Sequence, residues 1–160
     1  MLCREKKHRR NNFILQEAVH EPEYQNLKKP HDTKTEQPLQ RAHRLEINLE
    51  PDVFTEEKFN LFAHYQRTVH KEPPSKISRA GFKSFLCSGL VRSTFVGDGK
   101  ERNIGSYHSC YRIDGRLMAM GVLDLTPHCV SSVYLIYHED VNTWNFGKLS
   151  AMYEIAMAID

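Results

Sequence analysis

The stretch SYHSCYRIDGRLMAMGVLDL, residues 106–125, decides the fold. Its central dipeptide, Asp114-Gly115, tolerates the positive φ angles of a two-residue type I′ turn and separates two runs of strand-forming residues. We therefore predict a β-hairpin of residues 106–113 and 116–125. The second run is apolar on both faces, which is typical of a strand in the middle of a sheet.

The chain after the hairpin predicts one more strand and a helix. A break at 126–128 precedes a strand over 130–137, and a polar loop over 138–143 leads into a helix from about Asn145 to the end. Five residues of that helix have core spacing: Leu149, Met152, Tyr153, Ala156 and Ile159.

The chain before the hairpin predicts a strand and two helices. Residues 44–49 alternate polar and apolar, as a half-buried strand does. Thr55 caps a helix with Phe59, Phe62 and Val69 on its apolar stripe, and the pair Pro73-Pro74 ends it. A shorter helix from Ser78 turns Phe82, Phe85 and Leu86 inward and stops at Gly89, and 91–105 reads as a loop. This order predicts a layered α+β domain.

Composition limits the class of protein. The 160 residues are 40% hydrophobic and 26% charged, with a mean hydropathy of -0.57, which predicts one small globular domain and excludes a membrane protein or a wholly disordered chain. A net charge of +2 is too small for a dedicated nucleic-acid binder, so contacts with RNA must come from local patches. Without a secretory leader or a membrane segment, we expect a cytosolic protein, with the nucleus as the alternative location.

Residues 1–42 are polar and carry three of the prolines, which predicts a disordered or linker tail before a folded part over 43–160. The tail holds a basic cluster of Arg4, Lys6, Lys7, Arg9 and Arg10. Such a run is more often a solvated surface than a nuclear signal or a phosphate-binding patch.

The four cysteines, Cys3, Cys87, Cys110 and Cys129, form no Cys-x-x-Cys pair, so we expect free thiols in a reducing compartment. His128 and Cys129 point to opposite sides of an extended segment, which favours a buried structural thiol at Cys129 over a nucleophile. His108, Cys110, His128 and Cys129 lack the spacing of zinc ligands, so we expect no metal.

Several stretches resemble the C-terminal region of the arginyl-tRNA-protein transferases. They are 43–46 (HRLE), 65–70 (YQRTVH) with Pro73-Pro74, 82–87 (FKSFLC), 106–117 and 121–135. The run 127–137 is the most specific, because core packing alone would not select a cysteine and two serines inside an apolar strand.

The resemblance implies transfer of arginine from arginyl-tRNA to the amino terminus of proteins that begin with Asp, Glu or oxidised Cys, which marks them for ubiquitin-dependent degradation. It implies a fold like that of the N-acetyltransferases (GNAT-like), incomplete at the C-terminus, in which strand 130–137 and helix 145–160 form the donor cleft. The family's Cys-rich module and its later strands have no counterpart here, so we expect a fragment of low stability with an unpaired edge strand. A non-catalytic fragment that binds tRNA or protein N-termini is the alternative.

Transfer from an activated ester to an amine needs a neutral amine, close positioning and a stabilised oxyanion, without a protein nucleophile. Asp124 ends an apolar strand where its carboxylate can hold the ammonium or accept its proton; the alternative is a cap on the turn at 126–127. Ser132, expected on the same face as Tyr134, can donate to the oxyanion or to the terminal ribose. More often such serines bond to backbone.

Seven residues are candidates for substrate binding. Tyr107, His108 and Tyr111 can stack on the tRNA 3′ end, and Tyr134 adjoins Ser132. Arg112, Arg116 or His128 can supply the cation for an acidic N-terminal residue. We expect no cofactor beyond arginyl-tRNA as co-substrate and no membrane contact, and the oligomeric state stays open.

An acetyl-CoA-dependent N-acetyltransferase is the second enzymatic alternative. Such enzymes hold a pyrophosphate on backbone N–H groups in a glycine-rich loop before the helix. The matching stretch is 142–147 (NTWNFG), in which only Gly147 fits and Asn145 crowds the phosphate. The aminoacyl-tRNA donor is therefore favoured.

Overall fold

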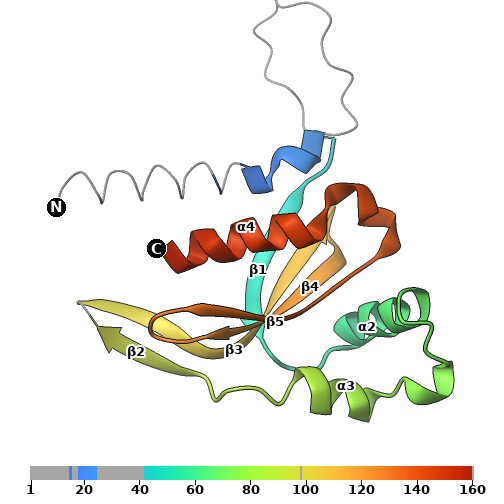
Figure 1. The fold of residues 1–160 in the computed structure, drawn as a ribbon, viewed down its shortest axis with the longest axis horizontal. Coiled ribbons are helices and arrows are strands. Elements are labelled where there is room, and N and C mark those ends of the chain that lie inside the picture. Colours follow the sequence, from blue (N-terminus) through green and yellow to red (C-terminus); the bar gives the residue numbers. More distant parts are fainter. Residues whose placement is uncertain (1–14, 16–17, 25–41, 98, 160) are drawn as a thin grey trace, which may run out of the picture.

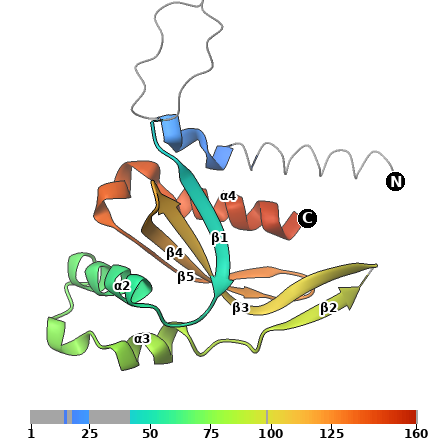
Figure 2. The same ribbon diagram turned by 180° about the vertical axis from the view of Figure 1, so that it is seen from behind.

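The computed structural model describes residue 15 and residues 18–24, 42–97 and 99–159. Its centre is an antiparallel sheet of five strands in the order β1-β3-β4-β5, with β2 paired to β3. The strands are β1 (Leu45–Pro51), β2 (Ser93–Gly97), β3 (Lys100–Ile113), β4 (Arg116–Leu125) and β5 (Val130–Tyr137). Helices α2 (Glu56–Thr68) and α3 (Arg79–Leu86) cover one face and α4 (Phe146–Ile159) the other (Figure 1 and, from behind, Figure 2), which confirms an α+β domain.

The predicted hairpin is confirmed. β3 and β4 pair antiparallel up to the turn, where Asp114 and Gly115 have φ angles of +52° and +82°. The Asp114 carboxylate also accepts the backbone N–H of Arg44 at 2.9 Å, which joins the turn to the start of β1. β4 lies between β3 and β5, as its two apolar faces predict.

The predicted loop over 91–105 is wrong, because it contains β2 and the first part of β3. β3 continues past the end of β4, where Gly105 pairs with Leu125, and β2 becomes its partner. Most residues of this extension are exposed, so they lack the apolar alternation that marks a strand in sequence.

The two helices on the first face begin where predicted. Thr55 accepts the N–H of Lys58 at 3.2 Å, and Ser78 accepts that of Gly81 at 3.0 Å. Phe82 is fully buried, but Phe85 is 57% exposed, contrary to the prediction. Both helices also end early: α2 at Thr68, before the prolines and with Val69 exposed, and α3 at Leu86, before Gly89.

Part of the predicted tail contacts the domain. Within a short 3₁₀-helix, Glu21–Tyr24, the fully buried carboxylate of Glu23 accepts the N–H of Leu45 at 2.6 Å. Val19 is buried in the core beneath α4. The basic cluster and Cys3 lie outside the described residues.

Helix α4 follows another 3₁₀-helix, Glu139–Trp144, which replaces the predicted polar loop. Asn145 joins the two with a φ of +52°, a conformation that asparagine tolerates. Leu149 and Ala156 are buried as predicted, and the other three predicted core positions are half-buried. Ile155 on α4 and Val133 on the edge strand β5 are each 52% exposed.

Within residues 15, 18–24, 42–97 and 99–159, no helix is long and apolar enough to cross a bilayer.

Candidate functional site

A β-bulge in the edge strand β5 decides which side chains share a face. Val122 pairs with Tyr134 and the next residue, Leu123, pairs with Ser132, so Val133 is the extra residue. Neighbouring residues of β4 point to opposite faces, and their partners do the same. Ser131 and Tyr134 therefore face α2 and α3, and the prediction that Ser132 shares a face with Tyr134 is wrong.

Ser132 instead faces α4. Burial raises the pKa of Glu154 on that helix, although the Ser132 hydroxyl works in the opposite direction. Sequence reasoning missed Glu154, because nothing in a helical pattern indicates which strand residue a glutamate meets.

Asp124 of β4 pairs with Ser131 of β5, and both side chains lie on the face of α2 and α3. The hydroxyl of Ser106 donates to its Oδ1 and in turn accepts the backbone N–H of Leu90 at 2.6 Å. A side chain at Gly89 would overlap Ser106, so this glycine permits the close approach of the segment after α3.

The alternative role of Asp124 as a cap on the following turn has no support in the turn's hydrogen bonds. Thr126 and Cys129 hold that turn through their own backbone and side-chain groups. Asp124 is only partly buried and is oriented by Ser106, so its carboxylate is held in place at the rim of the sheet.

Tyr134 has an aromatic environment at the same edge. Its hydroxyl lies 3.0 Å from Nε2 of His70, and the rings of Phe85 and Tyr65 pack edge-on against it at 5.3 and 6.3 Å. Phe85 is exposed because its ring packs on Tyr134 rather than in the core. We call the group of Asp124, Ser131, Tyr134, His70 and Phe85 the bulge site.

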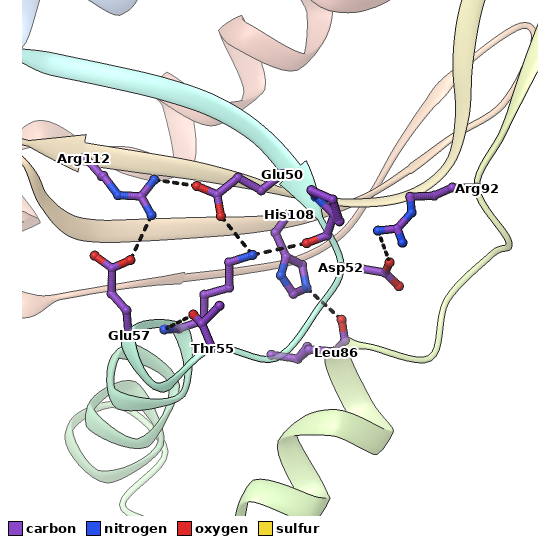
Figure 3. Close-up of polar contacts among 10 residues, drawn as sticks. Glu50, Asp52, Thr55, Glu57, Leu86, Arg92, His108 and Arg112 are labelled. Atoms are coloured by element: carbon purple, nitrogen blue, oxygen red, sulfur yellow. Dashed lines mark hydrogen bonds and ion pairs between the residues drawn. The ribbon is translucent and has the colours of Figure 1, made fainter.

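The charged residues of a second polar group on this face pair with one another (Figure 3). Arg112 bonds to Glu50 at 2.6 Å and to Glu57 at 2.9 Å, while Lys58, only 1% exposed, pairs with Glu50 at 3.0 Å. Although burial opposes it, these hydrogen bonds raise the pKa of Arg112. We call Glu50, Glu57, Lys58 and Arg112 the charge network. Because it occupies the Arg112 guanidinium, the expectation that Arg112 holds an acidic N-terminus finds no support.

The sequence predicted that His108 and Tyr111 stack on the tRNA 3′ end. Both residues are fully buried, so neither ring is accessible to a tRNA. Nε2 of His108 lies 2.8 Å from the carbonyl oxygen of Leu86 (Figure 3), and burial lowers the pKa of this imidazole. Tyr111 points to the other face and packs edge-on against Phe146 of α4 at 5.5 Å. Both are core residues because β3 is covered on both faces.

The remaining candidates lie apart. Tyr107 is half-buried, with the guanidinium of Arg92 5.9 Å from its ring centre, and Arg116 lies at the far end of the hairpin. His128 is exposed, packs on Phe95 at 6.3 Å and lines a groove of about 450 Å³ beside the end of α4.

Cys129 in the same turn is exposed, with Sγ 3.1 Å from the Thr126 hydroxyl, so the predicted buried thiol is wrong. His108 and Cys110 are buried on the sheet, whereas His128 and Cys129 are exposed in the turn, so the four residues considered as metal ligands are not gathered. In the part of the chain that the structure describes, no three His, Cys, Asp or Glu side chains gather as metal ligands.

Comparison with known proteins identifies the family. A family model described as "Arginine-tRNA-protein transferase, C terminus" matches residues 57–160. Arginyl-tRNA–protein transferase 1 of Arabidopsis thaliana is 40% identical over 123 residues, which are 75% of this chain and 20% of that protein. Its namesake in Saccharomyces cerevisiae is 34% identical over 125 residues, 68% of this chain and 24% of that protein.

A bacterial relative carries a different name. The aspartate/glutamate leucyltransferase of Pseudomonas savastanoi is 30% identical over 131 residues, 79% of this chain and 49% of that protein. The chain thus spans a fifth to a quarter of the two arginyl transferases above and about half of the leucyltransferase. Because the family model matches residues 57–160, which is more than half of the chain, the chain belongs to the arginine-tRNA-protein transferase family, of which it carries the C-terminal region.

Proposed function

We propose that the chain carries the transfer centre of an arginyltransferase. It moves arginine from arginyl-tRNA to the N-terminal amine of proteins that begin with Asp, Glu or oxidised Cys, and so marks them for ubiquitin-dependent degradation in the cytosol or nucleus. The family match supports the reaction class. The observation that carries the site is the bulge at Val133, which gathers Asp124, Ser131 and Tyr134 on one accessible face.

The chemistry fits these groups. The amine nitrogen bonds to the ester carbonyl carbon, and the bond from that carbon to the ribose oxygen breaks. Of the two protons that the ammonium loses, one passes to the Asp124 carboxylate and on to water, and the other goes to the ribose oxygen. Asp124 is suited to the first transfer because Ser106 fixes its orientation and leaves it partly exposed. The hydroxyls of Ser131 and Tyr134 are donors for the developing oxyanion. No cofactor is needed.

We also infer a GNAT-like arrangement. The succession of strand β5 and helix α4 supports this inference, with these two elements as the donor unit. The stretch before α4 does not favour acetyl-CoA, because Asn145 occupies the left-handed position and Trp144 stacks on Phe146 at 6.2 Å.

The names of the relatives suggest what the shared region does. Some are named for arginine as donor and others for leucine, and the leucyltransferases are also named for aspartate and glutamate. Because both groups share this region, we infer that it carries the chemistry they have in common, which is the transfer of an aminoacyl ester to the amine of an acidic acceptor. Recognition of the donor side chain, which differs between the groups, is then less suited to this region.

The test is transfer of radiolabelled arginine from arginyl-tRNA to a peptide that begins with Asp, beside an identical peptide that begins with Ala. We expect labelling of the Asp peptide, and a parallel reaction with leucyl-tRNA measures donor selectivity. Binding of tRNA or peptide without labelling would contradict the proposal and assign the chain a binding role.

A further inference from the structure

A pocket rich in cationic side chains lies on the α2 side of the sheet, where the β3–β4 turn and the end of β5 meet that helix. Its volume is about 380 Å³. Four basic side chains line it, two from α2, one from β4 and one just after β5: His64, Arg67, Arg116 and His138. None of them belongs to the bulge site or to the charge network.

Two of these side chains are stacked imidazoles. The rings of His64 and His138 lie 4.0 Å apart and 5° from parallel, and Nε2 of His138 is 3.2 Å from Nη2 of Arg116. Burial, followed by the nearby His64, lowers the pKa of His138. Protons on both rings repel one another and the guanidinium, so a bound anion would relieve an unfavourable arrangement.

The carboxylates around the pocket are either engaged elsewhere or exposed. Glu57 bonds to Arg112 in the charge network. Glu139 lies 3.7 Å from Nε2 of His64, and Asp140 lies 3.2 Å from Nδ1 of His138 and 3.7 Å from Arg116, but each is 57% exposed. Ion pairs this exposed contribute little, so a stronger anion can displace them.

We propose that this pocket binds a backbone phosphate of the tRNA donor, with Arg67, Arg116, His64 and His138 as its ligands. The inference rests on the proposed function for the source of the phosphate. Two guanidiniums and two protonated imidazoles are the donors that phosphate oxygens prefer. Arg67 is held at the rim by a bond from its Nε to the carbonyl oxygen of Ala63 at 3.1 Å.

The position of the pocket agrees with this ligand. His138 directly follows β5, four residues beyond Tyr134 of the bulge site, which is about 13 Å along a strand. The aminoacyl ester at the bulge site and a phosphate further along the same tRNA strand can therefore be held together. Such an anchor would position the ester and reduce the entropic cost of its reaction.

The first test uses inorganic phosphate and the imidazole NMR signals of His64 and His138. We expect phosphate to shift the signals of both rings and to raise the pKa of His138, relative to sodium chloride at equal ionic strength. Because the pKa of His138 in the free protein lies below the ordinary 6.5, phosphate binding should tighten as the pH falls below that value. Ring signals and a His138 titration that are unchanged in phosphate would overturn the proposal.

The second test uses binding of uncharged tRNA across a range of salt concentrations. We expect Arg116→Ala to reduce the slope of log affinity against log salt by about 1, as the loss of one phosphate contact does. His138→Gln is a second variant, and it should reduce the slope at a pH low enough to protonate the His138 ring. Arg44→Ala is the matched control, because Arg44 is also exposed and paired with one carboxylate, Glu46, but does not line the pocket.

An unchanged slope in Arg116→Ala and His138→Gln overturns the phosphate site. Both tests are read without aminoacyl transfer, so a failure of the proposed function leaves them interpretable. Phosphate binding without any change in tRNA affinity would show that the phosphate comes from another source than the tRNA, and would also contradict the proposal.

Discussion

The charge network and the bulge site lie on the same face of one sheet, yet their carboxylates differ. Glu50 in the network is held by two cations, Lys58 and Arg112. Asp124 in the bulge site has one neutral partner, the Ser106 hydroxyl. A carboxylate matched by buried cations stabilises the fold, whereas one oriented by a single hydroxyl at an open edge can meet a substrate amine. The same change from acid to amide at the two positions tests this difference.

The largest expected effect is on transfer by Asp124→Asn. The amide keeps an oxygen that accepts from Ser106 but cannot accept a proton, so we expect the rate of arginine transfer to fall about 10²-fold or more. The free energy of unfolding should change by less than about 1 kcal/mol. Single-turnover transfer and urea denaturation measure the two quantities. Transfer at the wild-type rate would remove Asp124 from the mechanism.

The matching change in the charge network is Glu50→Gln. It removes the carboxylate charge that pairs with Lys58 and Arg112. Breaking a buried ion pair costs about 3–5 kcal/mol. Because the Glu50 side chain is 28% exposed, we expect a smaller loss, about 2 kcal/mol. This loss in the free energy of unfolding should appear as a lower urea midpoint with an unchanged denaturant slope.

The pH dependence of stability gives a related check on Glu50. Burial opposes it, but bonds from Arg112 and Lys58 lower the pKa of Glu50 below its usual 4.5. Its contribution is therefore complete above about pH 4.5 and is lost as the pH falls through the folded pKa. Wild type and Glu50→Gln should converge in stability in acid. A constant difference down to pH 3 would contradict this account.

A smaller effect is expected from His108, which the sequence assigned to substrate binding. Burial lowers its pKa below 6.5, so the unfolded chain takes up the proton first and stability falls as the pH drops below about 6.5. His108→Gln, whose amide can still donate to Leu86, should reduce this fall. His128→Gln is the matched control, because His128 is exposed rather than buried. Equal effects of the two variants would show that the burial of His108 does not cause the fall in stability.

The smallest effect is expected from Tyr134→Phe. The variant loses the bond between the hydroxyl and His70, which at this exposed edge is worth about 0.5 kcal/mol of stability. Transfer should fall further than stability does, because the hydroxyl is proposed as an oxyanion donor. A parallel loss of both would make Tyr134 a structural residue.

The sequence predicted the elements with strong local signals. The Asp114-Gly115 turn, the Thr55 and Ser78 caps and the two-faced apolar strand β4 each have a local cause, and each is confirmed. The extension of β3 with β2 was missed because its residues are mostly exposed. The 3₁₀-helix that buries Glu23 was missed because its partner is a backbone N–H of Leu45, 22 residues later.

The candidate site was less predictable than the fold. Residue type alone suggested His108, Tyr111 and Arg112, but two of these are core residues and the third is neutralised by Glu50 and Glu57. His70, Glu154 and the stacked pair of His64 and His138 were missed, since each acquires its role from a neighbour distant in sequence. Asp124, Ser132 and the other assignments stay predictions until activity is measured.

The sequence by itself determined the family and the α+β class, because motifs, turns and caps depend on residues close together in the chain. Only the tertiary structure decided which polar groups remain accessible. One extra residue in β5, Val133, reverses the faces of the side chains on either side of it. That reversal depends on how β5 aligns with β4, and alignment is set by packing between layers, which no local pattern records.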